Sequence, residues 1–274
     1  MAGKLNKAAL ARKLGICRAT LYYKSKLTPK DEAAKDQIVE VLSSNPCYGH
    51  KRVAIELKMN KKKTLRIMKK YELEPRRRKR KGFVKMGDIG LAVAEYQNEV
   101  VNFCPVNPNV VWCGDFTYIR FRDAFIYLAT VIDAYTREIV DFALSRRHNR
   151  HLVKSAVLDA MKKRNCLPDY FHSDQGSEYQ SYEHADFLEK LGVKVSMSRK
   201  GSPWQNPYQE SFYSQFKFEL GNFNSLENDG QLAEVVYRQI YYYNNQRIHS
   251  ALKMSPGQFY QLATSKVDGL NKSV

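Results

Sequence analysis

Three consecutive strand-like segments, joined by short polar turns, limit most strongly what this chain can fold into. Residues 110–121, 125–136 and 138–145 are rich in Val, Ile, Phe, Tyr and Thr. Runs of β-branched and aromatic residues with so few residues between them predict antiparallel neighbours in one sheet. We therefore expect a three-stranded meander to begin the main domain.

The segments that follow alternate between helical and strand character. In chain order they are a helix over 149–165, a strand over 169–174, a helix over 182–192, a strand over 193–198 and a long helix from Pro207. Three antiparallel strands, then alternating helices and strands, then a last helix that crosses back over the sheet are the order of an RNase H-like fold. We predict an α/β core over 106–262, with a mixed five-stranded sheet, flanking helices and C-terminal helices, and a tail over 263–274.

Basic residues are concentrated in the first third of the chain. Residues 1–90 hold 25 of the 45 Lys and Arg residues but only 8 of the 28 Asp and Glu residues, so the whole formal net charge of +17 lies there. A solvated surface would distribute such an excess along the chain, whereas a module that binds a polyanion concentrates it. Double-stranded DNA is the expected partner, in preference to an acidic protein or a membrane surface.

Two small all-α DNA-binding modules are expected in this basic region. Residues 1–27 have the spacing of a helix-turn-helix, with Gly15 between two short apolar stripes, although an ordinary helical hairpin has the same pattern. Arg18 and its basic neighbours favour DNA binding. Residues 28–75 are interpreted as a second small helical domain. Its three helical segments are expected over 31–44, 50–58 and 61–71.

Residues 76–105 are predicted to form a basic linker. Its first part, RRRKRKGFVK, lacks apolar periodicity and begins with six consecutive cations. A flexible arm of this kind follows a nucleic-acid backbone through its charge, although a merely solvated linker has the same composition. The candidate DNA contacts in the arm are Arg76, Arg77, Arg78, Lys79, Arg80 and Lys81.

Composition excludes several other classes of protein. Hydrophobic residues make up 43% of the chain, so it is globular. No apolar run approaches the roughly 18 residues of a membrane span, and the N-terminus lacks the apolar centre of a secretory signal. The five cysteines are scattered without a CxxC pair, which argues against a disulfide framework and a structural zinc site. A reducing cytoplasm is expected.

Three acidic residues are candidates for chemistry. Asp115 lies inside the first strand, where a charge is costly unless it is paired or binds a cation. Asp174 follows the fourth strand, which an RNase H-like order places beside the first, so the two aspartates should converge. Glu210 lies on the first turns of the long helix. The 35 residues between Asp174 and Glu210 are enough to bring that helix back over the strand ends.

Three converging carboxylates would repel one another unless divalent cations neutralised them. Oxygen ligands suit Mg²⁺ or Mn²⁺, and two such ions roughly 3.5–4 Å apart promote an in-line phosphoryl displacement. Asp115, Asp174 and Glu210 are therefore the predicted catalytic and metal-binding residues. Taken alone, the stretch HSDQGSEY around Asp174 also has the composition of an ordinary turn.

Cations near these carboxylates are predicted to hold DNA. Lys217 is seven residues after Glu210, so it shares the same helical face. Arg199 and Lys200 lie in the loop that leads into the helix. We expect all three side chains to contact phosphate groups without reading bases.

Other polar residues are assigned structural roles. Asp133 is expected to shape the turn before the third strand, and Glu178 to be a solvated turn residue. Glu219 should lie on the side of the long helix opposite the catalytic glutamate. His172 is expected to pack or to support the site, and His249 to be structural.

Several segments of the chain resemble one family. They are 112–118 (WCGDFTY), 172–176 (HSDQG), 198–201 (SRKG) with Asn206, 210–212 (ESF) with Lys217, 243–252 (YNNQRIHSAL), Ser255-Pro256, and 48–52 (YGHKR). These segments are similar to the signature blocks of DDE transposases of the bacterial insertion sequence 3 family, whose core is of the retroviral-integrase type. The resemblance covers roughly 30–262.

The resemblance implies a metal-dependent transposase of the bacterial cytoplasm, acting at the nucleoid. Such an enzyme binds the ends of an insertion element, cuts one strand and joins the freed 3′ end to target DNA, and it works as a homo-oligomer, at least a dimer on paired ends. Asn206 becomes a further candidate DNA contact. The chain departs from the family pattern at 202–207, where SPWQNP stands in place of the usual NPYDNA, so the DNA contacts of that loop are expected to differ.

Two other functions remain open on the sequence. A DNA-binding regulator that has lost its chemistry would have no use for three converging carboxylates. An RNase H-type nuclease would share the metal chemistry, but the basic helical modules before the core favour recognition of element ends. A retroviral integrase is disfavoured because no His/Cys zinc module precedes the core.

Overall fold

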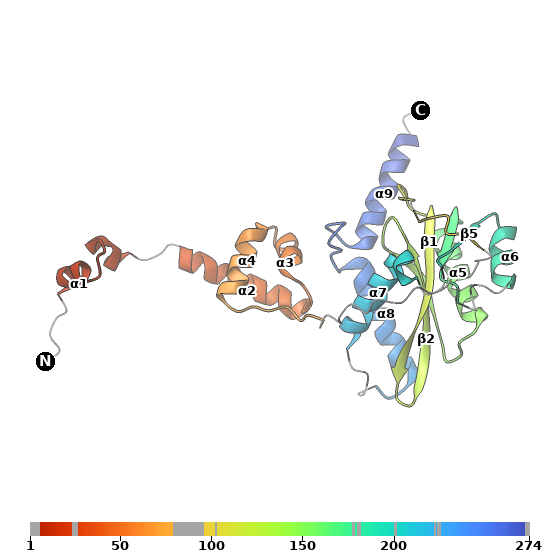
Figure 1. Cartoon of the computed structure of the whole chain (residues 1–274), viewed down its shortest axis with the longest axis horizontal. Helices are drawn as coiled ribbons and strands as arrows, with labels where there is room; N and C mark the ends of the chain where they lie inside the picture. Colours follow the sequence, from red (N-terminus) through yellow and green to blue (C-terminus); the bar gives the residue numbers. More distant parts are fainter. Residues whose placement is uncertain are drawn as a thin grey trace. The chain divides into compact units, whose positions relative to one another are not determined.

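The computed structural model of the chain describes residues 6–23, 27–78, 96–101, 103–176, 179, 182–199, 202–221, 223 and 226–271. Their contacts divide the chain into an N-terminal unit, Met1–Arg77, and a C-terminal unit, Arg78–Val274, which are described separately (Figure 1). Among the described helices, none combines the length and the apolar character that crossing a lipid bilayer requires.

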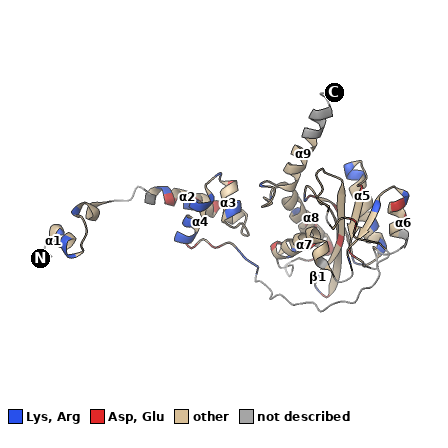
Figure 2. Cartoon of the chain, turned by 45° about the horizontal axis from the view of Figure 1, so that its top comes forward, with Lys and Arg blue, Asp and Glu red and all other residues tan. Residues whose placement is uncertain are grey.

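The N-terminal unit is entirely helical where it is described. Its elements are α1 (Lys7–Lys13), the 3-10 helix η1 (Arg18–Tyr22), α2 (Leu27–Ser44), α3 (His50–Glu56) and α4 (Lys61–Lys70). The side chain of Asn6 begins α1 by accepting hydrogen bonds from the backbone N–H groups of Ala8 and Ala9. Gly15 follows α1 with φ +64°, a left-handed conformation that favours glycine. Lys and Arg residues make up much of α3 and α4, where the ribbon is largely blue (Figure 2).

A buried carboxylate joins α2 to α4. The Asp31 side chain is 2% exposed and accepts two hydrogen bonds from the Arg66 guanidinium, at 2.6 and 2.7 Å, and one from Lys70 Nζ at 3.1 Å. The Arg66 guanidinium, helped by Lys70, holds the pKa of this carboxyl well below its usual range. Asp31 therefore stays ionised at neutral pH and fixes the position of α4 against α2.

The C-terminal unit is built on a five-stranded sheet with the order β3-β2-β1-β4-β5. The strands are β1 (Val111–Phe121), β2 (Ala124–Asp133), β3 (Ile139–Ser145), β4 (Tyr170–Ser173) and β5 (Lys194–Met197). Strands β1, β2 and β3 are antiparallel neighbours, whereas β4 pairs parallel to both β1 and β5. This mixed sheet, with the first and fourth strands adjacent at its centre, is the arrangement predicted for an RNase H-like core.

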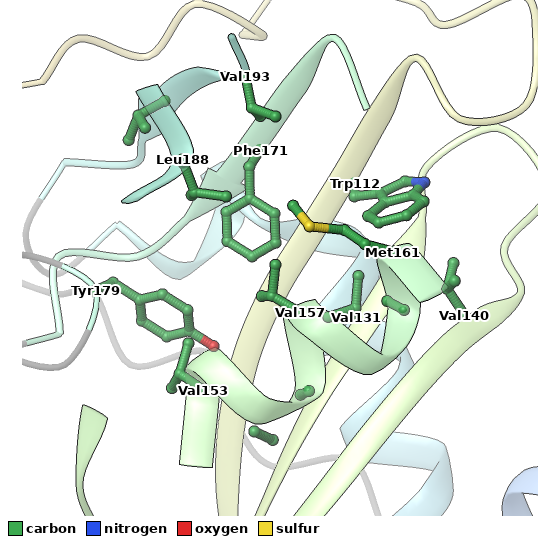
Figure 3. Packing of buried hydrophobic residues seen from close by; sticks show 14 of the residues in the cluster. Trp112, Val131, Val140, Val153, Val157, Met161, Phe171, Tyr179, Leu188 and Val193 are labelled. Carbon is green, nitrogen blue, oxygen red and sulfur yellow. The ribbon is translucent and has the colours of Figure 1, made fainter. Parts of the chain in front are cut away.

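Helices cover both faces of the sheet and make three layers (Figure 1). One face packs on α5 (Arg150–Arg164) and α6 (Tyr182–Lys190) through a large apolar cluster that includes Trp112, Val157, Phe171 and Leu188 (Figure 3). The other face packs on α7 (Pro207–Leu220) and α8 (Asp229–Asn245). Burial of these two apolar faces is the main stabilisation of the unit.

The last helix, α9 (Pro256–Asn271), is attached through aromatic side chains of its first turns. The ring of Phe259 lies 5.3 Å from that of Tyr135, and the Arg164 guanidinium lies 3.5 Å from the ring centroid of Tyr260. Arg164 also donates a hydrogen bond to Glu138 at 2.6 Å. An aromatic contact and a cation–π contact therefore hold this helix on the core, and the ion pair with Glu138 fixes the Arg164 side chain beside Tyr260.

Most of the predicted elements are present, and two differ. The second helix of the expected helix-turn-helix is only a five-residue 3-10 helix, η1. Short 3-10 turns are common where the chain lacks the length to continue an α-helix. The helix that begins at Pro207 is not the last one, because α8 and α9 follow it. Glu178 of the candidate residues lies outside the part of the chain that the structure describes.

Close packing against β1 requires a glycine next to Asp115. A Cβ atom on Gly114 would lie 2.9 Å from Cε1 of Phe171, closer still to its Cζ, and 3.2 Å from Cε1 of Tyr179. Both rings belong to the apolar cluster beneath α5 and α6 (Figure 3). The cluster therefore fills the space that a side chain on Gly114 would need.

Gly114→Ala should lower the free energy of unfolding by about 1–3 kcal/mol, because the rings must shift to admit the methyl group. Urea denaturation followed by circular dichroism measures the change. Gly49→Ala is the control, since a Cβ atom there meets no atom within 4 Å. A Gly114→Ala protein as stable as the wild type would show that the cluster adjusts freely.

Candidate active site

The two aspartates lie at matching distances beyond the paired residues of two neighbouring parallel strands. The pairing of β1 with β4 ends at Cys113 and His172. Asp115 lies two residues further along β1, and Asp174 lies two residues further along the chain, directly after β4. Asp115 and Asp174 consequently meet at the carboxyl end of the shared edge. A parallel register of this kind brings together side chains that are 59 positions apart in the sequence.

Glu210 completes the set of carboxylates around one cavity. It lies in the first turn of α7 and is exposed. A cavity of about 570 Å³ is lined by Asp115, Asp174 and Glu210 and by two cations, Arg199 and Lys217. All three predicted carboxylates therefore face the same space. Lys200, the third predicted cation of the loop, lies outside the described residues.

The electrostatics of the cavity disfavour two ionised aspartates. Burial, and then the negative charge of Asp174, raise the pKa of the Asp115 carboxyl to about 7. The backbone N–H of Phe116, which donates to Asp115 Oδ1 at 2.8 Å, and the Lys217 ammonium oppose this rise. Partial burial in turn lowers the pKa of Lys217, and the charge of Asp115 opposes that change. A further positive charge near Asp115 would favour its ionised form.

Buried polar side chains of α7 hold Glu210 in register with β1. Gln209, which is fully buried, donates to the backbone carbonyls of Cys113 at 2.6 Å and Thr130 at 3.0 Å. The Tyr213 hydroxyl lies 2.7 Å from the carbonyl oxygen of Asp115. The residues on both sides of Glu210 are thus bonded to the strand that carries Asp115. The sequence does not predict this role for Gln209 or Tyr213, because a glutamine or a tyrosine is equally common on the exposed surface of an ordinary helix.

Asn206 is placed differently from the sequence-based expectation of a DNA contact. It is only 5% exposed, and its Nδ2 donates to the backbone carbonyl of Gly114 at 3.2 Å. It lines the cavity and begins α7 as the residue before Pro207. This geometry assigns Asn206 to the attachment of α7 and leaves it little surface with which to contact DNA.

His172 links the strand that carries Asp174 to the loop before α7. Burial lowers its pKa to about 4, so the ring is neutral at physiological pH. Its Nε2 lies 3.1 Å from the carbonyl oxygen of Gln205, and its Nδ1 lies 2.9 Å from Ser196 Oγ. A carbonyl only accepts, so the proton is on Nε2, and Ser196 donates to Nδ1. The predicted supporting role of His172 agrees with these contacts.

The other structural expectations can be compared with the contacts. Asp133 is fully buried and accepts hydrogen bonds from the backbone N–H groups of Tyr135 at 2.9 Å and Thr136 at 2.8 Å, so it shapes the turn as predicted. Glu219 forms a buried ion pair with Arg247 at 2.8 Å. Burial raises the pKa of the Cys113 thiol to about 12 and keeps it protonated.

The predicted DNA contacts of the first third are only partly described. Arg18 begins η1 and is exposed. Arg76 follows α4, and its backbone N–H donates to the carbonyl of Pro46 at 2.7 Å. Arg77 and Arg78 are exposed. Lys79, Arg80 and Lys81 lie outside the described residues.

The carboxylates suit a divalent cation in their chemistry, although they are not gathered around one point. In the described part of the chain, no three Asp, Glu, His or Cys side chains come together as a complete cation site. Glu210 thus lines the cavity without joining the aspartate pair. Its side chain is exposed. The donors are carboxylate oxygens, and a cation would relieve the repulsion between Asp115 and Asp174, so the residues fit Mg²⁺ or Mn²⁺.

The raised pKa of Asp115 predicts a pH-dependent cost to stability in the metal-free protein. The unfolded carboxyl ionises near 3.8 and the folded one near 7, so between these values only the folded state keeps the proton. Stability therefore falls as the pH rises through this range. Asp115→Asn should raise Tm at about pH 8 in EDTA by about 2 °C or more.

Thermal denaturation of the Asp115→Asn protein across a pH series checks this expectation. The advantage of the variant should shrink as the pH falls from about 7 to about 4 and should change no further below about 4, where the wild-type carboxyl is protonated in both states. Asp159→Asn, whose carboxylate is 46% exposed on α5, is the control and should show no such trend. A variant no more stable than the wild type at alkaline pH would contradict the assignment of Asp115 as a destabilised charge.

Two family models match the C-terminal unit. Residues 105–203 match the model described as an integrase core domain, and residues 191–256 match a second model with the same description. The two matches together include Asp115, Asp174, Glu210 and Lys217. They also extend into α8.

Three bacterial relatives are transposases by name. The transposase for insertion sequence element IS904 of Lactococcus lactis is 40% identical over 155 residues, which are 56% of this chain and only 61% of that protein. The putative transposase InsK for IS150 of Escherichia coli is 30% identical over 254 residues, 89% of each protein. Transposase InsF for IS3A of Escherichia coli is 29% identical over 220 residues, 77% of this chain and 76% of that protein.

A solved structure has the same fold. The simian T-cell lymphotropic virus intasome, in complex with the PP2A regulatory subunit B56 gamma, contains a chain that matches with a TM-score of 0.51 at 15% identity, over 81% of this chain and 74% of that one. The sheet order and this match both support an RNase H-like core. With the resemblance in the sequence confirmed by these relatives, the chain belongs to the insertion sequence 3 family of transposases and has a retroviral-integrase-like catalytic core.

Proposed function

We propose that this transposase binds the ends of its insertion element and catalyses metal-dependent cleavage of one strand and its transfer to target DNA. The observation that carries the proposal is the cavity in which Asp115 and Asp174 meet, with Glu210 and Lys217 on its wall. A protein that only binds DNA would have no use for a buried aspartate pair, because the pair is unfavourable without a cation.

Asp115, Asp174 and Glu210 would hold two Mg²⁺ or Mn²⁺ ions. When bound, such ions activate the attacking oxygen and stabilise the leaving oxygen of an in-line phosphoryl displacement. Water is the first attacking group and cuts a strand at the element end. The freed 3′-hydroxyl then attacks a phosphodiester of the target, and the target's own 3′ oxygen leaves.

Lys217 and Arg199 would orient the DNA strand in the cavity. Lys217 shares a helical face with Glu210, and both cations line the cavity wall. A lysine ammonium holds a phosphate oxygen as a point charge, and an arginine holds it through paired N–H groups. These contacts position the strand and carry no sequence information.

The N-terminal unit and the basic arm would recognise the element ends. The four cations Lys61, Lys62, Lys63 and Lys69 are exposed on α4, while Arg66 and Lys70 are bonded to Asp31. A short basic helix of this kind suits the major groove. Arg18 and residues 76–81 add charge that follows the phosphate backbone.

A homo-oligomer, at least a dimer on paired ends, is the proposed working form, and the cytoplasm of a bacterium, at the nucleoid, is its proposed location. Two element ends must be held together for both to be joined to one target. A solved relative in fold is an intasome, and the relatives named above come from bacteria.

Asp115→Asn, Asp174→Asn and Glu210→Gln should each abolish cleavage and strand transfer while the affinity for element-end DNA stays within about twofold. The carboxylates act on the metal and not on base edges, and loss of a unit that works together lowers the rate by several orders of magnitude. Labelled element-end DNA incubated with each protein and Mg²⁺ gives cleavage and joining on one gel. Asp159→Asn is the control, and full activity in any site variant would remove that residue from the site.

Replacing Arg76, Arg77 and Arg78 together with Gln should weaken DNA binding and lower its salt dependence. Each phosphate that the protein no longer neutralises reduces the slope of log K against log salt by about 0.9. Titrations of duplex DNA over a salt series measure the slope. The control replaces Lys162 and Lys163, two cations of α5, with Gln. An unchanged slope in the arginine variant would show that the start of the arm does not touch DNA.

A further inference from the structure

One face of the β1–β2 hairpin remains exposed, and its side chains are aromatic or basic. Successive residues of β1 alternate from Thr117 to Phe121, with buried residues toward α7 and α8 and exposed ones on the other face. The exposed fractions are 57% for Tyr118 and 48% for Phe125, its neighbour on β2. The residues that share this face, which we call the hairpin face, are Phe116, Tyr118, Arg120, Phe125 and Tyr127.

A cation of the active site reaches the hairpin face. β4 pairs with β1 only as far as Cys113, so none of the described strands covers the edge of β1 beyond that point. Lys217 of α7 crosses this edge, and its Nζ lies 4.7 Å from the ring centroid of Tyr118. The ring of Phe125 meets that of Tyr118 nearly perpendicularly at 5.3 Å. The cavity and the hairpin face are therefore continuous through Lys217.

A second contact joins the same two surfaces. Phe116 lines the cavity next to Asp115, and its ring lies 4.5 Å from that of His148. The His148 ring in turn stacks on Tyr127 at 5.0 Å. Phe116 and Tyr127 are half-buried, whereas Tyr118 and Phe125, further along the same face toward the end of the hairpin, are more exposed.

The chemistry of the hairpin face fits a nucleic-acid strand whose bases are unpaired. Four of its positions carry aromatic rings and the fifth carries an arginine, with no carboxylate among them. Aromatic rings beside cations bind single strands because every base has a flat face that stacks, while its phosphate pairs with the cation. A duplex offers only phosphates and base edges, because its base faces are already stacked.

We propose that the hairpin face binds unpaired nucleotides of the DNA strand that enters the active-site cavity. The bases stack on Tyr118 and Phe125, and the ammonium of Lys217 moves from the Tyr118 ring to the adjoining phosphate. This inference rests on the proposed function, because it places the nucleotides beside the phosphate to be cut. Stacking would offset part of the cost of unpairing the end of a duplex.

Binding of the full chain to two fluorescein-labelled probes tests the proposal. The probes are a thymidine oligonucleotide of about 15 nucleotides, within the usual site size, and a duplex of the same length. Fluorescence anisotropy is measured in EDTA, which prevents chemistry, and at a salt concentration that suppresses phosphate binding by the basic N-terminal residues. The protein carries Tyr118→Ala together with Phe125→Ala.

The double variant should lose at least about fivefold in affinity for the single strand, and up to about 150-fold for each stacked base, with duplex affinity unchanged. Tyr118→Phe together with Phe125→Tyr keeps both rings and should restore binding. Tyr237→Ala on α8 is the matched control, since Tyr237 is 60% exposed, and should bind both probes like the wild type.

Three outcomes would overturn the proposal. The double alanine variant could bind the single strand with wild-type affinity, or it could lose affinity for the single strand and the duplex equally. In the third outcome, Tyr237→Ala would lose as much affinity for the single strand as the double alanine variant. The proposed function fails by a separate result, namely cleavage that survives in Asp115→Asn. Because the binding comparison needs no catalysis, the two failures are distinguishable.

Discussion

The short parallel pairing of β1 with β4 is the constraint on which the active site depends. It consists of three residue pairs, from Val111 and Tyr170 to Cys113 and His172. Where it ends, two aspartates lie side by side, and no strand in the described part of the chain pairs with this edge of β1 any further. The same interruption therefore provides both the charged pair and the opening through which α7 side chains approach it. A longer β4 would cover the carbonyl edge and close the cavity.

The attachment of α7 is polar, although the helix lies over an apolar face. Gln209 and Tyr213 bond to backbone carbonyls of β1 and β2, whose positions the sheet fixes, and both also bond to the hydroxyl of Thr130 on β2. Hydrogen bonds to backbone carbonyls have narrow geometry and set the helix at one register. Apolar contacts such as Phe212 and Phe216 add stability but would tolerate a small sliding of the helix.

The sequence predicts the fold well because its periodicities are strong. The three strands of the meander and the alternating elements after them are where the β-branched and helical patterns put them. Asp115 is recognisable because a charge interrupts an apolar run, and Asp174 because the expected strand order places the end of its strand beside Asp115. Gln209 has no such signal, since a glutamine on a helix is usually solvated and only the sheet beneath it makes it buried.

The resemblance assigns Asn206 to DNA, whereas its side chain faces β1 in the structure. Glu210 illustrates what spacing alone leaves open: the helix does return to the cavity, but the orientation of one exposed side chain depends on what it binds. The N-terminal helices illustrate a different limit, because residues 18–22 have helical composition in a segment too short for the cooperative hydrogen bonding of an α-helix.

The buried Asp31 has a consequence for how the charge of this protein is counted. Two of the cations on α4 share a single buried carboxylate, and their side chains are committed to holding two helices together. The count of Lys and Arg residues in this unit therefore overstates the number of cations whose side chains are uncommitted and can pair with a polyanion. A chain that lost this one acid would become more attractive to nucleic acid without gaining a basic residue, at the expense of its folding. Removal of Asp31 would thus raise the affinity for DNA and lower the stability of the N-terminal unit. Evolution toward tighter, less selective DNA binding is therefore restrained by the packing of α2 against α4.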